Sequence, residues 1–401
     1  MKYKSTGIAI TAASLAIISQ ASATNGVNLI GIGPISRSLG GTGIAAPQDA
    51  VSAVFSNPAA MCISESCSKP QADFSLTTFM PSTSAKISMG PNTFKGDSDS
   101  DLYFIPAMGV SLPIGHEGSH WRAGMAIYGI SGLGVDYESE PIGSVIPFNF
   151  TELQIMKVAP SVAYSINPDV SIGASLHVNY ASLEIGSGVF PTGKNDDTDW
   201  SMGIQLGATW RISNSVTAGL TYTTAQSNTF EDVMPEFGMM GPTGATTDFD
   251  LELPQQAGIG VAWVGMEERL TLSFDCKWIN WGSADGYSDF GWRDQWTFGL
   301  GAQYEVIQDT MVLRIGYNYG ENPLRNQEFQ QDVMSIVGFP AIVEHHLGMG
   351  IGYQINEDFV LNLSWVHAFE NTMKSKTPDG SAKVESSLSE DTIDVGLTWR
   401  F

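Results

Sequence analysis

The sequence has little charge, few cysteines and no long apolar run. Only 15% of its 401 residues are charged, whereas soluble domains average roughly a quarter. No run of 18 or more apolar residues occurs, which excludes membrane-spanning helices, because each needs about 20 such residues. Three cysteines are too few for a disulfide scaffold. Cys62 and Cys67 are spaced so that they can pair in an oxidising compartment.

Positive charge is scarcer than negative charge. Nineteen Lys and Arg face 42 Asp and Glu, for a formal net charge of −23. Nucleic-acid binding needs clustered Lys and Arg, so this balance argues against it. No cofactor is expected either: Gly31-x-Gly33 is followed by Ser36, where a dinucleotide fingerprint requires Gly.

Metal-binding and catalytic motifs are weak. The pair Cys62 and Cys67 lacks a second ligand pair for zinc. His345 and His346 are adjacent, and on a strand they point to opposite faces, so one metal ion cannot easily take both. No Gly-x-Ser-x-Gly motif occurs. We therefore expect neither a metal site nor an enzyme.

The N-terminus has the features of a secretory signal peptide. Lys2 and Lys4 precede an apolar stretch at 8–18, and Ala21-Ser22-Ala23 provides small residues for cleavage. The apolar stretch is too short to span a bilayer. We expect residues 1–23 to be removed and the protein to be exported.

Beyond residue 72 the chain alternates apolar and polar residues, which is the period of a β-strand. In 200–212, Trp200, Met202 and Leu206 share one face, while Ser201 and Gln205 share the other. Fourteen such segments occur, near 72–88, 102–112, 121–135, 150–165, 170–185, 200–212, 215–229, 250–264, 270–281, 295–305, 311–319, 343–355, 359–369 and 389–401.

The connections between these segments alternate between short turns and long loops. Aromatic residues on the apolar face lie near both ends of the strands, for example Trp210 and Trp399 at the short turns and Tyr222 and Tyr317 at the long loops. Two aromatic belts beside an aliphatic band are typical of a membrane barrel, and a soluble sandwich or propeller gives no reason for them. We predict an all-β fold, a 14-stranded antiparallel transmembrane β-barrel at 66–401.

A barrel of this size is too wide for its own side chains to fill, so the lumen is a channel or holds a plug. Residues 24–65 lack the alternation and contain Gly31, Gly33, Gly40, Gly41 and Gly43. We predict that this segment folds into the lumen.

The run from Arg37 to Ala50, with Gly40, Gly41 and Gly43, followed by Phe55-Ser56-Asn57-Pro58-Ala59, resembles the N-terminal hatch of the FadL/TodX family of outer-membrane transporters. The resemblance implies a hatch-closed barrel that passes long-chain fatty acids or aromatic hydrocarbons. It assigns hatch roles to Gly40, Gly41, Gly43, Phe55, Asn57, Pro58 and Ala59. The family commonly has an acidic pair before Asn-Pro-Ala, and here only Asp49 remains, after Gln48.

Two further features match the family. Gly129, Gly132 and Gly134 interrupt the third strand, where the family has a kink that opens the barrel wall sideways into the membrane. The chain also ends in Trp399-Arg400-Phe401, which resembles the assembly signal of outer-membrane barrels.

The long loops contain apolar residues that are suited to capturing a hydrophobic ligand. The predicted capture residues are Phe148, Met234, Phe237, Met239, Met240 and Phe339. The alternative is that these side chains only pack the loops over the barrel mouth.

The sequence thus predicts a monomeric barrel in the outer membrane of a Gram-negative cell. Its partners would be a hydrophobic ligand, membrane lipid and lipopolysaccharide. Alternative functions are a water-filled porin for polar solutes and a surface adhesin or receptor.

Overall fold

The alternating segments form the strands of one barrel. The computed structural model describes residues 24–62, 70–115, 119–190, 192–238 and 241–401; the predicted signal peptide, Cys67, Met239 and Met240 lie outside these residues. Fourteen strands of the described chain build the wall: β3 (Gln71–Met89), β5 (Tyr103–Ile114), β6 (Trp121–Asp136), β7 (Phe150–Asn167), β8 (Val170–Gly186), β9 (Lys194–Ser213), β10 (Val216–Thr223), β13 (Gln256–Gly265), β14 (Leu270–Ile279), β15 (Gln295–Ile307), β16 (Met311–Gly320), β17 (His345–Gln354), β18 (Phe359–Lys376) and β19 (Ala382–Arg400).

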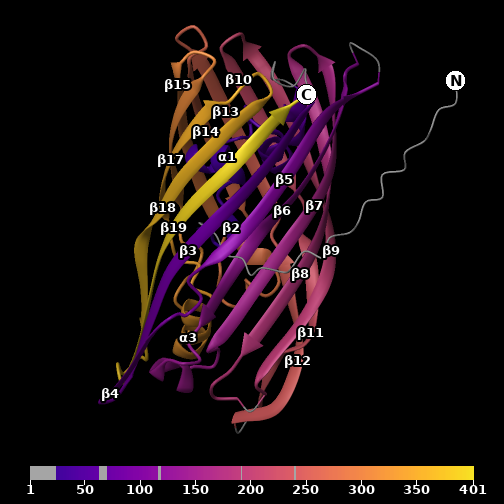
Figure 1. The fold of residues 1–401 in the computed structure, drawn as a ribbon. Coiled ribbons are helices and arrows are strands. Elements are labelled where there is room, and N and C mark those ends of the chain that lie inside the picture. The colour runs from indigo at the N-terminus through magenta and orange to yellow at the C-terminus, as the bar shows by residue number, and fades with distance from the viewer. Residues whose placement is uncertain (1–23, 63–69, 116–118, 191, 239–240) are drawn as a thin grey trace, which may run out of the picture.

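The barrel closes by pairing its last strand with its first. β19 runs antiparallel to β3 from Ala382 opposite Met89 to Arg400 opposite Gln71. Figure 1 shows the strands tilted around a common axis, with the short turns and the C-terminus at the top and the long loops at the bottom. Closure gives the first and last strands partners, as a lipid environment demands. The predicted 14-stranded antiparallel barrel is confirmed.

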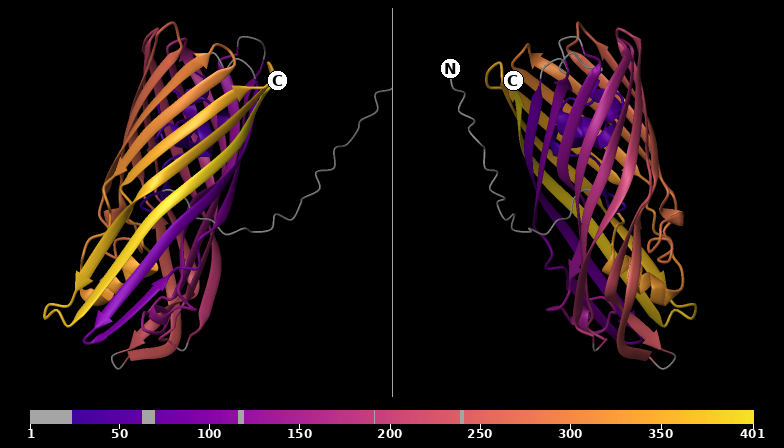
Figure 2. Two further views of the ribbon diagram at one scale, coloured as in Figure 1. Left: turned by 60° about the vertical axis from the view of Figure 1, so that its left-hand side comes forward. Right: turned by 90° about the vertical axis from the view of Figure 1, so that its right-hand side faces the viewer.

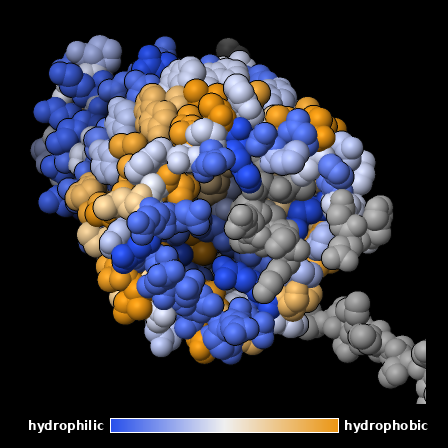
Figure 3. All heavy atoms as spheres, turned by 90° about the horizontal axis from the view of Figure 1, so that it is seen from above, coloured by the Kyte–Doolittle hydropathy of each residue, from blue (hydrophilic) through white to orange (hydrophobic). Residues whose placement is uncertain are grey.

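Side chains alternate between the lipid face and the lumen as predicted. On β9, Met202 is 67% exposed and Leu206 is 52% exposed, whereas Ser201 and Gln205 are each 4% exposed. Exposed apolar side chains on a long sheet face are stable only against lipid. Viewed from the short-turn end, hydrophilic atoms gather across the middle of the surface and hydrophobic atoms lie mostly toward its rim (Figure 3).

Two predicted strands, 215–229 and 250–264, are each divided in the structure. The chain leaves the wall after Thr223 and returns at Gln256, where β10 pairs directly with β13. The intervening residues form a separate two-stranded sheet of β11 (Gln226–Gly238) and β12 (Gly241–Leu253). The alternating pattern continues through both strands because a projecting hairpin has the same period of two as a wall strand.

Several strands project beyond the rim at the long-loop end. β3 continues into a hairpin with β4 (Asn92–Asp97), and Figure 2 shows β18 and β19 extending past the rim beside it. The long loops also contain two 3-10 helices, η3 (Pro141–Ser144) and η4 (Trp281–Ser283), and the helix α3 (Phe329–Gly338).

Residues 24–62 lie inside the barrel. They form β1 (Thr24–Asn25), β2 (Asn28–Leu29), α1 (Gly33–Ser38), α2 (Ala50–Ser56) and η1 (Pro58–Cys62). Asp49 precedes α2 as its N-cap, and its side chain accepts a hydrogen bond from the Ser52 N–H at 2.6 Å. Within the described residues, every helix is too short or too polar to cross a membrane.

Candidate functional site: the lumen, its hatch and the external loops

The hatch, residues 24–62 of the described chain, is fastened to strands on several sides of the barrel. Asp275 of β14 accepts hydrogen bonds from the main-chain N–H groups of Gly43 and Ile44, at 2.8 and 3.0 Å. The Asn318 amide of β16 donates to the Gly40 carbonyl at 3.1 Å. These bonds pair hatch backbone groups that would otherwise be buried without partners.

Asn57 is the central polar residue of the Asn-Pro-Ala element. Its side chain is fully buried and donates to the carbonyls of Ile44 and Ala208, at 2.8 and 3.1 Å. Its Oδ1 accepts from the Ala59 N–H at 3.1 Å, and the Ala59 carbonyl accepts from the Ser171 hydroxyl at 2.9 Å. Asn57 therefore ties two parts of the hatch to each other and to the wall. Pro58 follows as the first residue of η1.

The three predicted hatch glycines allow close approaches. Gly40 and Gly41 have φ of +67° and +77°. A Cβ added at Gly40 would lie 2.5 Å from the Tyr317 carbonyl oxygen, and one at Gly41 would lie 2.1 Å from that of Ile30. A Cβ at Gly43 would lie 2.7 Å from the Ser56 hydroxyl. Only glycine fits the first two positions without strain.

α1 is held by a buried ion pair. Arg37 Nε lies 3.5 Å from Asp394 Oδ2 of β19, and both side chains are almost fully buried. Arg37 also donates to the Thr392 hydroxyl at 3.0 Å, and Asp394 accepts from the Ser364 hydroxyl at 2.6 Å. A buried ion pair is tolerated when such additional bonds satisfy it.

The residues predicted to form a lateral opening, Gly129, Gly132 and Gly134, lie on β6 next to the hatch. β6 shifts register between Gly129 and Ser131 in its pairing with β7. Its pairing with β5 ends at Tyr128, opposite Ala107, and Ser131 is instead paired with Asn28 of the hatch. The region that contains Gly132 and Gly134 is thus joined to β7 on one side and touched by the hatch on the other.

Phe55 connects the hatch with this region of the wall. Its ring packs edge-on against Tyr128, with centroids 5.6 Å apart, and Tyr128 directly precedes Gly129. Sequence reasoning had placed Phe55 and Gly129 in separate features, and the fold brings them together.

The external loops converge on the lumen through aromatic side chains. The loop aromatic cluster consists of Phe148, Trp281, Tyr287, Phe290, Trp292 and Phe339. The Phe339 ring lies 6.1 Å from that of Phe148 and 5.8 Å from that of Phe290. Trp281, Tyr287 and Trp292 form a second group, with centroids 4.6 to 5.0 Å apart.

Of the predicted capture residues, Phe148 and Phe339 belong to this cluster, and Met234 packs against its apolar surroundings. Phe237 lies on β11, and Met239 and Met240 lie outside the described residues. The aromatic residues of 281–292 were missed. The signal was their density, four aromatics within twelve residues.

The region around the loop aromatic cluster is apolar and nearly filled. A cavity of about 20 Å³ lies between cluster residues and Leu153 and Leu183 of the wall. Burial raises the pKa of the Tyr287 hydroxyl above its usual range. Within the described residues that hydroxyl has no hydrogen-bond partner. Such a surrounding suits an apolar ligand, which needs no polar partner.

The hatch extends to these loops. A Cβ added at Gly26 would lie 2.9 Å from the Trp281 ring. Buried hydrophobic residues form one continuous cluster from the loops, through Leu153 and Ile155 of the wall, to Leu29 and Val54 of the hatch. The lumen therefore contains a continuous apolar column bounded by a membrane-spanning wall.

Polar side chains are buried in the lumen as well. Lys157 Nζ is 2.9 Å from His177 Nδ1, and the Asn179 amide donates to Gln226 and Ser201, at 2.8 and 3.0 Å. These bonds join β7, β8, β9 and the start of β11.

The two adjacent histidines do point to opposite faces: His346 is fully buried, and His345 is exposed. No group of three or more His, Cys, Asp or Glu side chains in the described ranges is placed to hold a metal ion.

Comparisons with known proteins agree with this architecture. Residues 12–399 match the family described as outer membrane protein transport protein (OMPP1/FadL/TodX). The fold is similar to that of the Pseudomonas putida toluene transporter TodX, with a TM-score of 0.72 and 19% identity over 93% of this chain and 99% of that one.

Two further crystal structures are similar. A Pseudomonas aeruginosa FadL homologue has a TM-score of 0.72 and 15% identity over 94% of this chain and 100% of its own. The Ralstonia pickettii toluene transporter TbuX has a TM-score of 0.63 and 18% identity over 93% of this chain and 99% of its own. No curated protein matches the sequence significantly.

Proposed function

The chain belongs to the OMPP1/FadL/TodX family of outer membrane transport proteins, and from this premise we propose that it is a passive channel for hydrophobic small molecules. The observation that carries the proposal is the apolar column, which runs from Phe339 and Trp281 in the loops to Leu29 and Val54 in the hatch. A porin for polar solutes needs a polar, water-filled lumen. The continuous apolar packing of loops, wall and hatch argues against that alternative.

The proposed path has three stages. The loop aromatic cluster captures the ligand from outside, because aromatic and Met side chains adapt to apolar molecules of varied shape. The ligand then enters the apolar column by displacing side chains. Movement of the hatch near Phe55 and Asn28 finally releases it sideways, between β5 and β6, at Gly129, Gly132 and Gly134.

The ligand class in this proposal is long-chain fatty acids or hydrocarbons. The two toluene transporters among the similar structures support the hydrocarbon branch. The protein acts without a cofactor and without catalysis. It works as a monomer that contacts membrane lipid and lipopolysaccharide, after export directed by residues 1–23.

Uptake measurements in a deletion strain test the proposal. The strain is complemented with the wild type or with Phe339→Ser, and entry of radiolabelled oleate and toluene is followed. Phe369→Ser is the control, because Phe369 is 45% exposed on the outer face of β18, away from the lumen. We expect the wild type to restore uptake of at least one solute, and Phe339→Ser, unlike Phe369→Ser, to reduce it.

Liposome swelling separates the channel types. The wild-type protein should give no swelling with sugars, because the hatch and the apolar column exclude them. Rapid sugar entry without hydrophobic uptake in cells would show that the protein is a porin and refute the proposal. Absence of both activities would favour an adhesin or receptor.

A further inference from the structure

Lysines gather at one place on the outer wall. The described residues contain eight lysines. Five of them lie together at the projecting ends of β3, β4, β18 and β19. This lysine cluster consists of Lys86, Lys95, Lys374, Lys376 and Lys383. In a chain with a net charge of −23, such a concentration of positive charge is unexpected.

Strand pairing aligns these lysines on one face. Lys86 is opposite Lys95 on one side and Glu385 on the other, and Glu385 is opposite Lys374. Two residue pairs further out, Lys376 is opposite Lys383. Paired residues of antiparallel strands share a face, so the five ammonium groups point to the same side of the sheet.

That side is the outer one. Val384, between Lys383 and Glu385, is buried on the inner face, and so is Ile87, next to Lys86. Alternation then turns the lysines outward, and all five are exposed. The sheet therefore separates the lysine cluster from the apolar column, so the cluster does not belong to the proposed ligand path.

The pairing is electrostatically unfavourable without a ligand. Like charges directly opposite each other destabilise a sheet, yet Lys86 faces Lys95 and Lys376 faces Lys383. Of the five lysines, only Lys374 has an ion pair with a described residue, Glu385, at 3.1 Å. Asp97 and Glu140 line the adjoining groove with Lys95, and they leave the cluster with excess positive charge.

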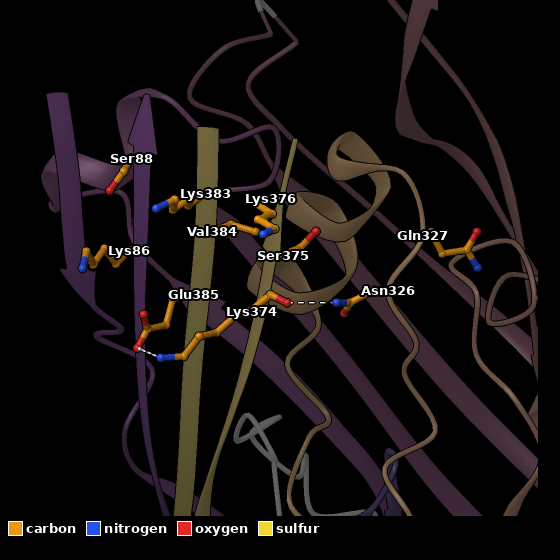
Figure 4. A pocket seen from close by; sticks show the side chains of 10 residues that line it. All are labelled: Lys86, Ser88, Asn326, Gln327, Lys374, Ser375, Lys376, Lys383, Val384 and Glu385. Carbon is orange, nitrogen blue, oxygen red and sulfur yellow. Dashed lines mark hydrogen bonds and ion pairs between the residues drawn. The ribbon is translucent and has the colours of Figure 1, made fainter. Parts of the chain in front are cut away.

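The cluster borders a groove of about 500 Å³ that is open to solvent. Figure 4 shows Lys86 and Lys383 on one side of it and Asn326 and Gln327 on the other. Asn326 Nδ2 donates to the Lys374 carbonyl at 3.0 Å, which fixes the far wall. The groove thus has cationic and amide donors and room for a sugar-sized anionic group.

The height of the cluster above the membrane identifies the kind of anion. Met80 is the last apolar residue on the outer face of β3 before Ser82, Ser84 and Lys86. Six residues of strand span about 20 Å, or about 15 Å along the membrane normal at a tilt of about 40°. Phospholipid headgroups end about 5–8 Å beyond the hydrocarbon. Lys86 therefore stands at the level of the sugars of lipopolysaccharide.

We propose that the lysine cluster binds the phosphate and carboxylate groups of the inner-core sugars of lipopolysaccharide. Each lysine supplies a point charge that suits such oxyanions. Binding would neutralise the opposed pairs Lys86–Lys95 and Lys376–Lys383. It would also orient an otherwise acidic protein within an anionic outer leaflet.

The test is titration of the full-length protein, purified in detergent, with lipopolysaccharide that carries a phosphorylated inner core. The variant K86Q/K376Q/K383Q removes three charges that have no ion pair among the described residues. We expect it to weaken binding about 10- to 100-fold, because each lysine near an anionic surface contributes about tenfold or less. The matched control K86R/K376R/K383R keeps the charge and should bind like the wild type. Heat-dependent gel migration verifies that each variant is folded.

Three other ligands distinguish the source of the anion: lipid A without core sugars, dephosphorylated core lipopolysaccharide, and phosphatidylglycerol vesicles. We expect each of them to bind more weakly than the phosphorylated core. Equal binding of lipid A or phosphatidylglycerol would overturn the assignment to the core. Unchanged binding by the Gln variant, or loss of binding by the Arg variant, would also overturn the proposal.

Discussion

Thr42 of the hatch and Ser273 of β14 place their hydroxyl oxygens 2.7 Å apart. This contact joins the hatch directly to the barrel wall. A similar separation, 2.6 Å, occurs within the wall between the hydroxyls of Ser161 on β7 and Ser175 on β8. The two contacts make a matched pair for testing whether the hatch has to move.

Locking the hatch should stop transport. In a background carrying Cys276→Ser, the variant T42C/S273C should form a disulfide on oxidation, because its side chains are already in contact. We expect oxidation to abolish hydrophobic uptake and a reductant to restore it. Oxidised S161C/S175C, which joins wall to wall, should transport normally. Full transport through the oxidised T42C/S273C protein would show that hatch movement is not required.

Removing the Asn57 side chain should loosen the hatch without unfolding the barrel. Asn57→Ala removes the side-chain donor to the carbonyls of Ile44 and Ala208, and for the buried Ile44 carbonyl the loss costs about 1–3 kcal/mol. The strand pairing of the wall is unaffected. We expect faster hydrogen exchange in 40–60 and a measurable ion conductance in planar bilayers. A variant with no ion conductance and with unchanged hydrogen exchange in 40–60 would show that Asn57 does not hold the hatch.

Gly40 and Gly90 provide a comparison between close approach and backbone conformation. Both have a left-handed backbone, with φ of +67° and +57°, so alanine costs about 1–2 kcal/mol at either. Gly90 has open space around it, whereas a Cβ at Gly40 would meet the Tyr317 main chain, which adds about 1–3 kcal/mol. Hydrogen exchange in α1 should therefore rise for Gly40→Ala and not for Gly90→Ala. Equal effects would mean that the contact with β16 is unimportant.

The ion pair between Arg37 and Asp394 should be costly to break on one side only. Arg37→Met leaves the buried Asp394 carboxylate without its cation, which typically costs about 3–5 kcal/mol. In the double variant R37M/D394N the uncompensated charge is gone, and we expect most of the loss to be recovered. The temperature at which 24–62 becomes sensitive to protease measures the release of the hatch in the single and the double variant. A double variant no better than R37M would show that the bond to Thr392, rather than the charge, holds α1.

Much of the fold could be predicted from the sequence, because alternate residues of a membrane barrel face lipid and lumen and therefore differ in polarity. Met202 and Gln205 were assigned to opposite faces, and the structure places them there. The two strands that were predicted too long, 215–229 and 250–264, show where this signal fails. Alternation reports that a strand has two different faces, but it does not report which strand is its neighbour.

Less of the candidate site could be predicted from the sequence. The Asn57-Pro58-Ala59 element was found through its resemblance to a family motif, and its hydrogen bonds to Ile44 and Ala208 had no sequence signal. The contact between Phe55 and Tyr128, and the pairing of Asn28 with Ser131, join residues that are about 70 to 100 positions apart. Only the closed barrel brings them together.

By itself, the sequence determined the number of strands, the lipid and lumen faces, and the family resemblance of the hatch, because these depend on local order and residue type. The tertiary structure decided where the hatch is fastened, how the loop aromatics meet the lumen, and that five scattered lysines form one outward patch. These are contacts across the barrel. They arise because closure sets the register between strands, and no local pattern encodes that register.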